Sequence, residues 1–307
     1  MKKINRSSFI RQSSLAMIGI TFANLAGAMP RIDSHRLSFS TLGCPDWSYT
    51  AILKFAAEKG YNGIELRGLL RELDLTKCPE FSNAEKIAVS RKMAEDMGLT
   101  IVDLGSSAQL HHADKIKRKN NLDEARKFID LAQRLNCPYI RVFPDSLPKD
   151  QGRNATIDLI SEGLLELADY AKGTDVSVLL ESHGDGVESS ELLRIMKNSE
   201  NLHVGMVWDV YNMWSVTKES PKRVYEQLGK YIRHTHIKDA KITNGVERYV
   251  LLGQGEAPVE EAVQSLEQGG YTGFYSFEWE KLWHPDIEEP DIALAQFPAA
   301  IKKYFKK

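Results

Sequence analysis

Residues 176–181 read VSVLLE, and this short run decides the fold. The stretch from Val176 to Leu180 is almost wholly aliphatic and contains two β-branched valines. Such a nearly continuous apolar run is typical of a parallel β-strand that is covered on both faces. The run then stops at a carboxylate, Glu181. The rest of the chain repeats this arrangement, so we expect a largely parallel sheet covered by helices.

The repeated unit is a short apolar run followed by a longer stretch with a helical pattern. Glycine just past a helix, as at Gly60 and Gly98, and proline in a first turn mark where helices stop and start. The predicted strands are residues 37–42, 63–66, 100–104, 139–143, 176–181, 203–209, 231–237 and 274–278. The predicted helices are residues 48–59, 83–97, 122–135, 156–171, 189–196, 221–228, 258–268 and 291–304.

Eight strand-then-helix units match a TIM barrel in number and in total length. An open, doubly wound sheet is the alternative, but it usually has fewer repeats and carries a glycine-rich loop after its first strand. No such loop follows the first predicted strand, and the GQG sequence at 253–255 follows the seventh. We therefore predict an α/β fold, a (β/α)8 TIM barrel, over residues 37–307.

The first 28 residues have the pattern of a signal peptide. An apolar segment, 13–26, is too short to be a comfortable membrane span and ends in the small residues Ala26-Gly27-Ala28. We predict that residues 1–28 are removed on export to the periplasm and that residues 29–36 form a short extension. The alternatives are an ordinary N-terminal helix and a retained signal-anchor. The segment before the apolar run carries the basic residues Lys2, Lys3, Arg6 and Arg11.

The charge balance excludes one class of partner. The chain has 40 basic and 42 acidic residues, and loss of the four basic residues of the signal peptide would change its net charge from −2 to −6. A mildly acidic protein is a poor candidate for non-specific nucleic-acid binding. We therefore expect a small-molecule partner, no nucleic acid and no stable membrane span after cleavage, and we leave the oligomeric state open.

Polar residues stand at the ends of four successive predicted strands. The fifth ends at Glu181 and the sixth at Asp209, the seventh carries His234 and His236, and the eighth ends at Glu278. A lone glutamate at a strand end is more often a solvated cap, but a barrel forces these ends to converge. Two glutamates, one aspartate and one histidine suit Mn²⁺, Co²⁺, Zn²⁺ or Mg²⁺. We therefore expect one divalent metal at this end of the barrel.

The motifs around these strand ends resemble those of the xylose-isomerase-like sugar (phosphate) isomerase/epimerase superfamily. The resemblance runs from about residue 37 to the C-terminus and implies a TIM barrel. The motifs are RVF at 141–143, LLESHG at 179–184, WDVYN at 208–212, HTHIKD at 234–239, GQGE at 253–256 and GYTGFYSFE at 270–278.

The resemblance implies that the chain is an enzyme, a metal-dependent sugar isomerase or epimerase. It assigns the metal to Glu181, Asp209, His236 and Glu278, and makes the two glutamates an acid/base pair as well. A metal bound by carbonyl and hydroxyl oxygens acidifies the neighbouring C–H and stabilises an enediolate. One carboxylate then removes the proton, and the other, or a relay, returns it.

Three further residues are candidates for substrate binding: Arg141, His183 and Lys238. We expect Arg141 in the site because a buried guanidinium without a partner is costly. His183 either contacts substrate or hydrogen-bonds a metal ligand, and Lys238 either contacts substrate oxygens or pairs with Asp239. Nearby, Glu65 and Arg67 could simply pair with each other.

Two positions depart from the ketose 3-epimerases of the superfamily. Their histidine three residues after the Asp209 position is Asn212 here, and their arginine six residues after the His236 position is Ile242. Their substrate contacts therefore do not transfer directly. Because phosphosugars are mainly cytoplasmic, an exported enzyme points to a free or oxidised sugar, with a 3-keto-sugar as an attractive case.

Two other functions remain open at this stage. The first is a lyase, hydratase or hydrolase that uses the same enolate chemistry on a keto-sugar or glycoside. The second is a non-catalytic periplasmic sugar-binding protein, against which the intact Glu/Asp/His/Glu set argues.

Overall fold

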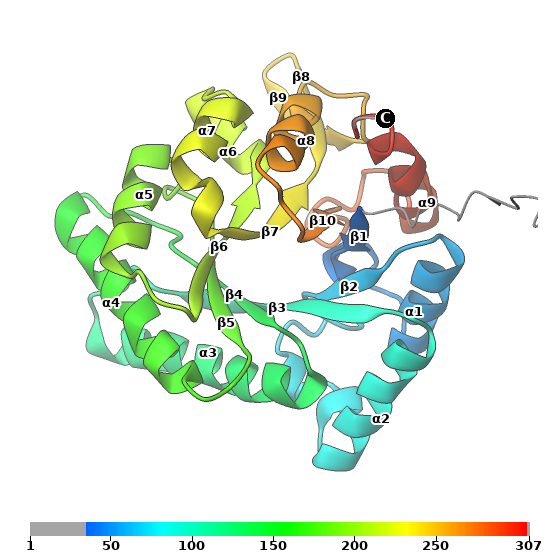
Figure 1. Cartoon of the computed structure of the whole chain (residues 1–307), viewed down its shortest axis with the longest axis horizontal. Helices are drawn as coiled ribbons and strands as arrows, with labels where there is room; N and C mark the ends of the chain where they lie inside the picture. The colour runs from blue at the N-terminus through cyan, green and yellow to red at the C-terminus, as the bar shows by residue number, and fades with distance from the viewer. Residues whose placement is uncertain (1–34, 306–307) are drawn as a thin grey trace, which may run out of the picture. The chain divides into compact units, whose positions relative to one another are not determined.

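The computed structural model describes residues 35–305, which belong to one compact unit (Figure 1). The predicted signal peptide, and residues 29–34 of the predicted extension, lie outside the described residues. In the described part, no helix is long and apolar enough to cross a membrane.

Eight parallel strands form a nearly closed barrel, which confirms the predicted fold class (Figure 1). Their order is β1-β10-β7-β6-β5-β4-β3-β2, and a parallel bridge between Ser40 and Glu65 brings the last strand back to the first. All eight predicted strands are present. Their bounds are β1 (Arg36–Phe39), β2 (Gly63–Leu66), β3 (Thr100–Gln109), β4 (Tyr139–Phe143), β5 (Ser177–Glu181), β6 (Val204–Asp209), β7 (Ile232–Ile237) and β10 (Phe274–Phe277).

Helices follow the strands and surround the barrel (Figure 1). They are α1 (Tyr49–Glu58), α2 (Ala84–Asp96), α3 (Lys115–Leu135), α4 (Arg153–Ala171), α5 (Ser189–Asn198), α6 (Val210–Thr217), α7 (Pro221–Leu228), α8 (Val259–Gln268) and α9 (Pro290–Ile301). Short 3-10 turns are η1 (Thr41–Gly43), η2 (Leu75–Lys77), η3 (Pro79–Phe81) and η4 (Gly229–Tyr231).

Two helices differ from the sequence prediction. We expected α3 to begin at Leu122, but it begins at Lys115 because the Asp114 carboxylate caps the amides of residues 116 and 117. The helix α6 was not predicted. It starts directly after β6, with Asp209 as its N-cap, so strand and helix share one uninterrupted stretch of sequence.

A two-stranded hairpin that the sequence analysis missed follows β7. It consists of β8 (Asp239–Thr243) and β9 (Val246–Val250), which pair antiparallel from Asp239↔Val250 to Thr243↔Val246. Its tip is Asn244-Gly245, and both residues have positive φ angles of 54° and 76°. This combination is the usual two-residue turn of a tight hairpin. The NG pair was the signal that could have identified it.

The core lies between the barrel and its helices. Every residue of β5 and β6 is buried, which agrees with strands covered on both faces. The strands β5 and β6 end in the polar residues Glu181 and Asp209. The candidate site lies at these carboxyl ends of the strands.

Candidate active site at the carboxyl ends of the strands

Four side chains from successive strands of the sheet converge on one point. The strands β5, β6 and β7 provide Glu181, Asp209 and His236, and Glu278 directly follows β10. Each residue offers one donor atom, and these four atoms all lie within 4.8 Å of one another. All four side chains are buried. The structure therefore brings together the four residues to which the sequence analysis assigned the metal.

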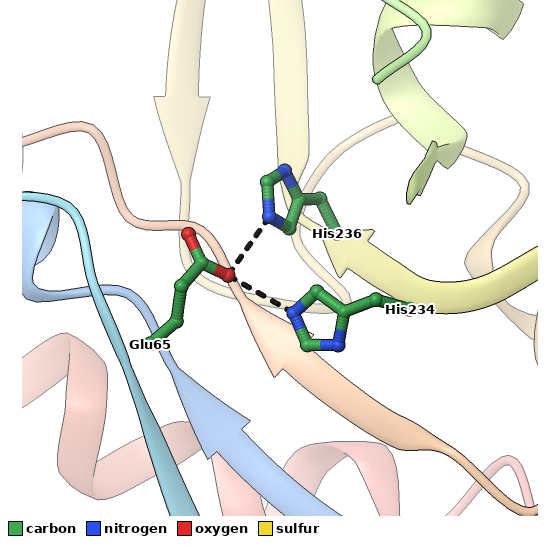
Figure 2. A group of neighbouring side chains, drawn as sticks. All are labelled: Glu65, His234 and His236. Carbon is green, nitrogen blue, oxygen red and sulfur yellow. Dashed lines mark hydrogen bonds and ion pairs between the residues drawn. The ribbon is translucent and has the colours of Figure 1, made fainter. Parts of the chain in front are cut away.

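His236 stands between the two glutamates. Its Nδ1 lies 3.1 Å from Oε1 of Glu181 and 3.2 Å from Oε1 of Glu278. The opposite ring nitrogen, Nε2, lies 2.9 Å from Oε2 of Glu65 (Figure 2). With a metal bound, Nε2 would keep its proton and donate it to Glu65, and the lone pair of Nδ1 would be free for the ion. This is the tautomer that a metal-binding imidazole needs.

Glu65, on β2, is the residue whose role the sequence analysis missed. Its Oε2 also accepts from His234 Nε2 at 3.0 Å (Figure 2). The Ser276 hydroxyl donates to the same oxygen at 3.3 Å. Glu65, His234 and His236 also satisfy the spacing of a metal group, but direct hydrogen bonds at 2.9 and 3.0 Å already join them. Glu65 therefore positions the two histidines and does not pair with Arg67.

Lys238 places an ammonium among the carboxylates. Its Nζ lies 2.8 Å from Oδ2 of Asp209 and 2.7 Å from Oε2 of Glu278, and it also contacts Glu280. The expected alternative, a pair with Asp239, does not form. Asp239 instead accepts three backbone amides of the loop at residues 253–257. Lys238 is thus a buried cation within the site.

Arg141, on β4, is fully buried next to Glu181. Its Nε lies 3.0 Å from Oε2 of Glu181, and its Nη1 donates to the backbone oxygen of Ser106 at 2.8 Å. The guanidinium also covers the ring of Phe143, 3.8 Å from the ring centroid. Arg141 therefore lies in the site, as expected, and it holds one of the candidate metal ligands in place.

The two positions that depart from the ketose 3-epimerases have different surroundings. The backbone amide of Asn212 donates to Oδ1 of Asp209 at 2.8 Å, so the residue orients this carboxylate through its main chain. Ile242 lies in β8 and is 44% exposed. The side-chain amide of Asn212 donates to the backbone oxygen of Ser182 at 3.4 Å.

His183 lies at the rim and does not touch the four converging residues. Its Nδ1 is 3.4 Å from Oδ1 of Asp145, and its ring packs against Phe143 with centroids 4.4 Å apart. The side chain is 39% exposed, so it is open to a ligand. Substrate contact therefore stays a prediction for His183, and the alternative of a hydrogen bond to a metal ligand is not observed.

The electrostatics of the cluster are those of a cation site. Burial disfavours ionised carboxylates, but neighbouring cations outweigh it and lower the pKa of Glu181 and of Glu278. Burial also opposes a charged His236, yet the surrounding glutamates raise its pKa well above the usual value. For Asp209, burial prevails over Lys238 and raises the pKa to about 7.

The residues present fit a divalent metal. Oε2 of Glu181 and Oδ2 of Asp209 are buried and, within residues 35–305, accept no well-aligned hydrogen bond; each has only an ion pair to a cationic side chain. Three carboxylates and one imidazole form a hard, mixed oxygen and nitrogen donor set. The cluster could therefore hold a metal ion, and Arg141 and Lys238 flank that position.

In TIM-barrel enzymes the active site lies at this carboxyl rim of the barrel. The chain belongs to the xylose isomerase-like TIM barrel family, whose sequence model matches residues 53–297. This result confirms the resemblance seen in the sequence motifs.

Curated relatives of the chain are sugar epimerases. Fructoselysine 3-epimerase from Shigella flexneri is 23% identical over 258 residues, which cover 80% of this chain and 91% of that protein. L-ribulose-5-phosphate 3-epimerase from Salmonella heidelberg is 24% identical over 250 residues, covering 80% and 85% of the two chains.

A solved structure with the same fold contains a metal. The IolI protein with a bound zinc atom has a TM-score of 0.71 and 19% identity, and the match covers 89% of this chain and 100% of that one. We conclude from the family and from these similarities that the chain is an enzyme.

Proposed function

We propose that the enzyme isomerises or epimerises a free or oxidised sugar by moving a proton at a carbon next to a carbonyl group. The observation that carries the proposal is the convergence of four buried donor atoms, two of them from glutamates that flank one imidazole nitrogen. Sugar epimerases among the relatives support the reaction class.

Glu181, Asp209, His236 and Glu278 would hold one divalent metal, Mn²⁺, Co²⁺, Zn²⁺ or Mg²⁺. When bound, such a cation polarises a carbonyl oxygen, acidifies the neighbouring C–H and stabilises the enediolate. The zinc atom in the IolI structure supports a metal in this fold.

The protein's own residues perform the proton transfer. Glu181 and Glu278 approach His236 Nδ1 through one oxygen each, and their lowered pKa keeps both carboxylates ionised. One of them accepts the proton from the substrate carbon, and the other, or a relay, returns it. Lys238 and Arg141 bind substrate oxygens and hold the two glutamates in place.

Solvent exchange at carbon tests the reaction. We would load the purified protein with each metal and incubate it in D₂O with a panel of ketoses, aldoses, 3-keto-sugars and the corresponding uronic acids. We expect NMR to detect deuterium at the carbon next to the carbonyl. A stereoisomer or positional isomer of the sugar should form as the product. An unsaturated product would instead indicate elimination, and the absence of exchange with the whole panel would contradict the proposal.

We also propose that the chain acts outside the cytoplasm, in the periplasm, after removal of residues 1–28. The support is the basic start, the short apolar run and the small residues at 26–28. This location favours a free or oxidised sugar over a phosphosugar.

A further inference from the structure

A second arginine, Arg67, lies at the mouth of the barrel and forms no ion pair within residues 35–305, although Glu181, Glu278 and Glu124 lie near enough to act on its charge. It directly follows β2, and only 6% of its surface is exposed. Its Nη2 donates to the Ser107 hydroxyl at 3.1 Å, while its Nη1 is buried and has no hydrogen-bond partner. Among the described residues 35–305, no carboxylate lies within ion-pair distance of this guanidinium, in contrast to Arg141 and Glu181.

Arg67 and Arg141 approach each other across Gly105. Leu66 pairs with Leu104, and Gly105 pairs with Arg141. Arg67, directly after β2, therefore lies beside Gly105 within β3 and Arg141 within β4. A Cβ atom on Gly105 would lie 2.7 Å from Cδ of Arg67 and 2.9 Å from Nη2 of Arg141. Any larger residue at position 105 would clash, because the side chains of Arg67 and Arg141 occupy the space beside Gly105.

This arrangement is costly unless a ligand completes it. Burial, and after it repulsion from the Arg141 guanidinium, lowers the pKa of Arg67 to about 10, although Glu181, Glu278 and Glu124 act in the opposite direction. Leaving a buried charge without a partner is strongly unfavourable. A sugar hydroxyl could accept a hydrogen bond from Nη1, but it would leave the guanidinium without a directly bound anion. An anion satisfies both requirements.

We propose that Arg67 binds a carboxylate group of the substrate and so selects acidic sugars over neutral ones. This inference rests on the proposed function, because it places the sugar at the same barrel mouth. A planar carboxylate matches the planar donors of a guanidinium. A phosphate dianion would bring a second negative charge, and the nearest other cation, Arg141, is already paired with Glu181.

Binding to the metal-loaded enzyme, measured by calorimetry, tests this assignment. The probes are D-glucuronate and D-galacturonate, each with its neutral hexose and its hexose 6-phosphate. We expect at least one hexuronate to bind about 10- to 100-fold more tightly than its matched hexose, as expected for a hydrogen bond to a charged group. Equal binding of acid and neutral sugar, no binding of either acid, or a preference for the 6-phosphate would overturn the proposal.

Variants separate a binding role from a structural one. Arg67→Gln should abolish the preference for the acid, and Arg67→Lys should keep only part of it, because lysine has the charge without the planar donors. The control is Arg71→Gln, on the exposed Arg71 that pairs with Asp46, and it should keep the wild-type preference. Each variant should bind metal and melt like the wild type, so that a loss of preference reports on Arg67 itself.

The binding measurements test the role of Arg67 separately from the proposed proton transfer. Failure of deuterium exchange together with a preference for hexuronates that depends on Arg67 would contradict the proposed proton transfer and leave the acid specificity standing. Deuterium exchange on neutral sugars, without any preference for acidic sugars, would support the proton transfer and contradict the acid specificity.

Discussion

Glu65 Oε2 lies 2.9 Å from His236 Nε2, on the side of the imidazole that faces away from the candidate metal ligands. The two residues are 171 positions apart in the sequence. A carboxylate that accepts the second N–H of a metal-binding histidine fixes its tautomer, orients its ring and makes it a better ligand. Glu65 is therefore the main support of His236.

We expect Glu65→Gln to weaken metal binding by about 10- to 100-fold, since the side chain keeps its size but loses its charge. Titration of the metal-free protein with Mn²⁺ or Zn²⁺ in a calorimeter measures this change. The control is Glu58→Gln, on an exposed carboxylate of α1, which should bind metal like the wild type. Unchanged affinity in the Glu65 variant would show that His236 needs no such support.

The double variant Asp209→Ala, His236→Ala should purify without its metal. These residues provide two of the four donors that lie within 4.8 Å of one another, and the remaining two glutamates are too few for a tight site. Elemental analysis of the protein is the measurement. Asp96→Ala, at the exposed end of α2, is the matched control. Undiminished metal in the double variant would exclude this set of ligands.

Glu278→Gln and Glu181→Gln should each slow proton transfer. Glutamine keeps the shape and one ligand oxygen but cannot act as a base, and a positioned carboxylate contributes about 10²–10⁴-fold. We expect deuterium incorporation to fall by that factor, with some metal and sugar binding retained. If both single variants exchange at the wild-type rate, other residues move the proton.

Metal binding should release more protons at low pH than at high pH. Asp209 has a raised pKa of about 7 and is therefore protonated below it, so a metal must displace that proton in acid but not in alkali. The surrounding glutamates raise the pKa of His236, and neighbouring cations lower the pKa of Glu181 and of Glu278, so we assign the difference in proton release between low and high pH to Asp209. Metal affinity should accordingly fall as the pH is lowered.

Calorimetry in buffers of different ionisation enthalpy counts these protons. We expect about one more proton released per metal at about pH 5.5 than at about pH 8.5. Equal release at both values would mean that Asp209 is ionised before the metal arrives.

The N-terminus of the protein recovered from the cell envelope should be Met29. Residues 1–28 have a basic start, an apolar run and a small-residue end, and cleavage after Ala28 leaves this terminus. Sequencing of the first residues is a direct measurement. An intact Met1 on protein from the cytoplasmic fraction would contradict export.

Local patterns in the sequence were enough to predict the barrel and the four converging side chains. An apolar run that ends in a charged residue, as at Glu181, marks both a buried strand and its polar end. Parallel topology then brings all such ends to one rim, which groups Glu181, Asp209 and Glu278 with the two histidines of the seventh strand. The choice of His236 over His234 came from the family resemblance. The helix α6 was missed because Asp209 is at once a strand end and an N-cap.

Only the tertiary structure decided which polar groups pair with one another. Lys238 contacts Asp209 and Glu278 and not its neighbour Asp239. Glu65 binds two histidines from β7, and Arg67 faces Arg141 across Gly105. These partners depend on the register of the strands and on closure of the barrel, which set distances of about 3 Å between residues far apart in the chain. Hydrophobic periodicity specifies which face of a strand is buried, but it carries no information about which side chain meets which inside the closed barrel.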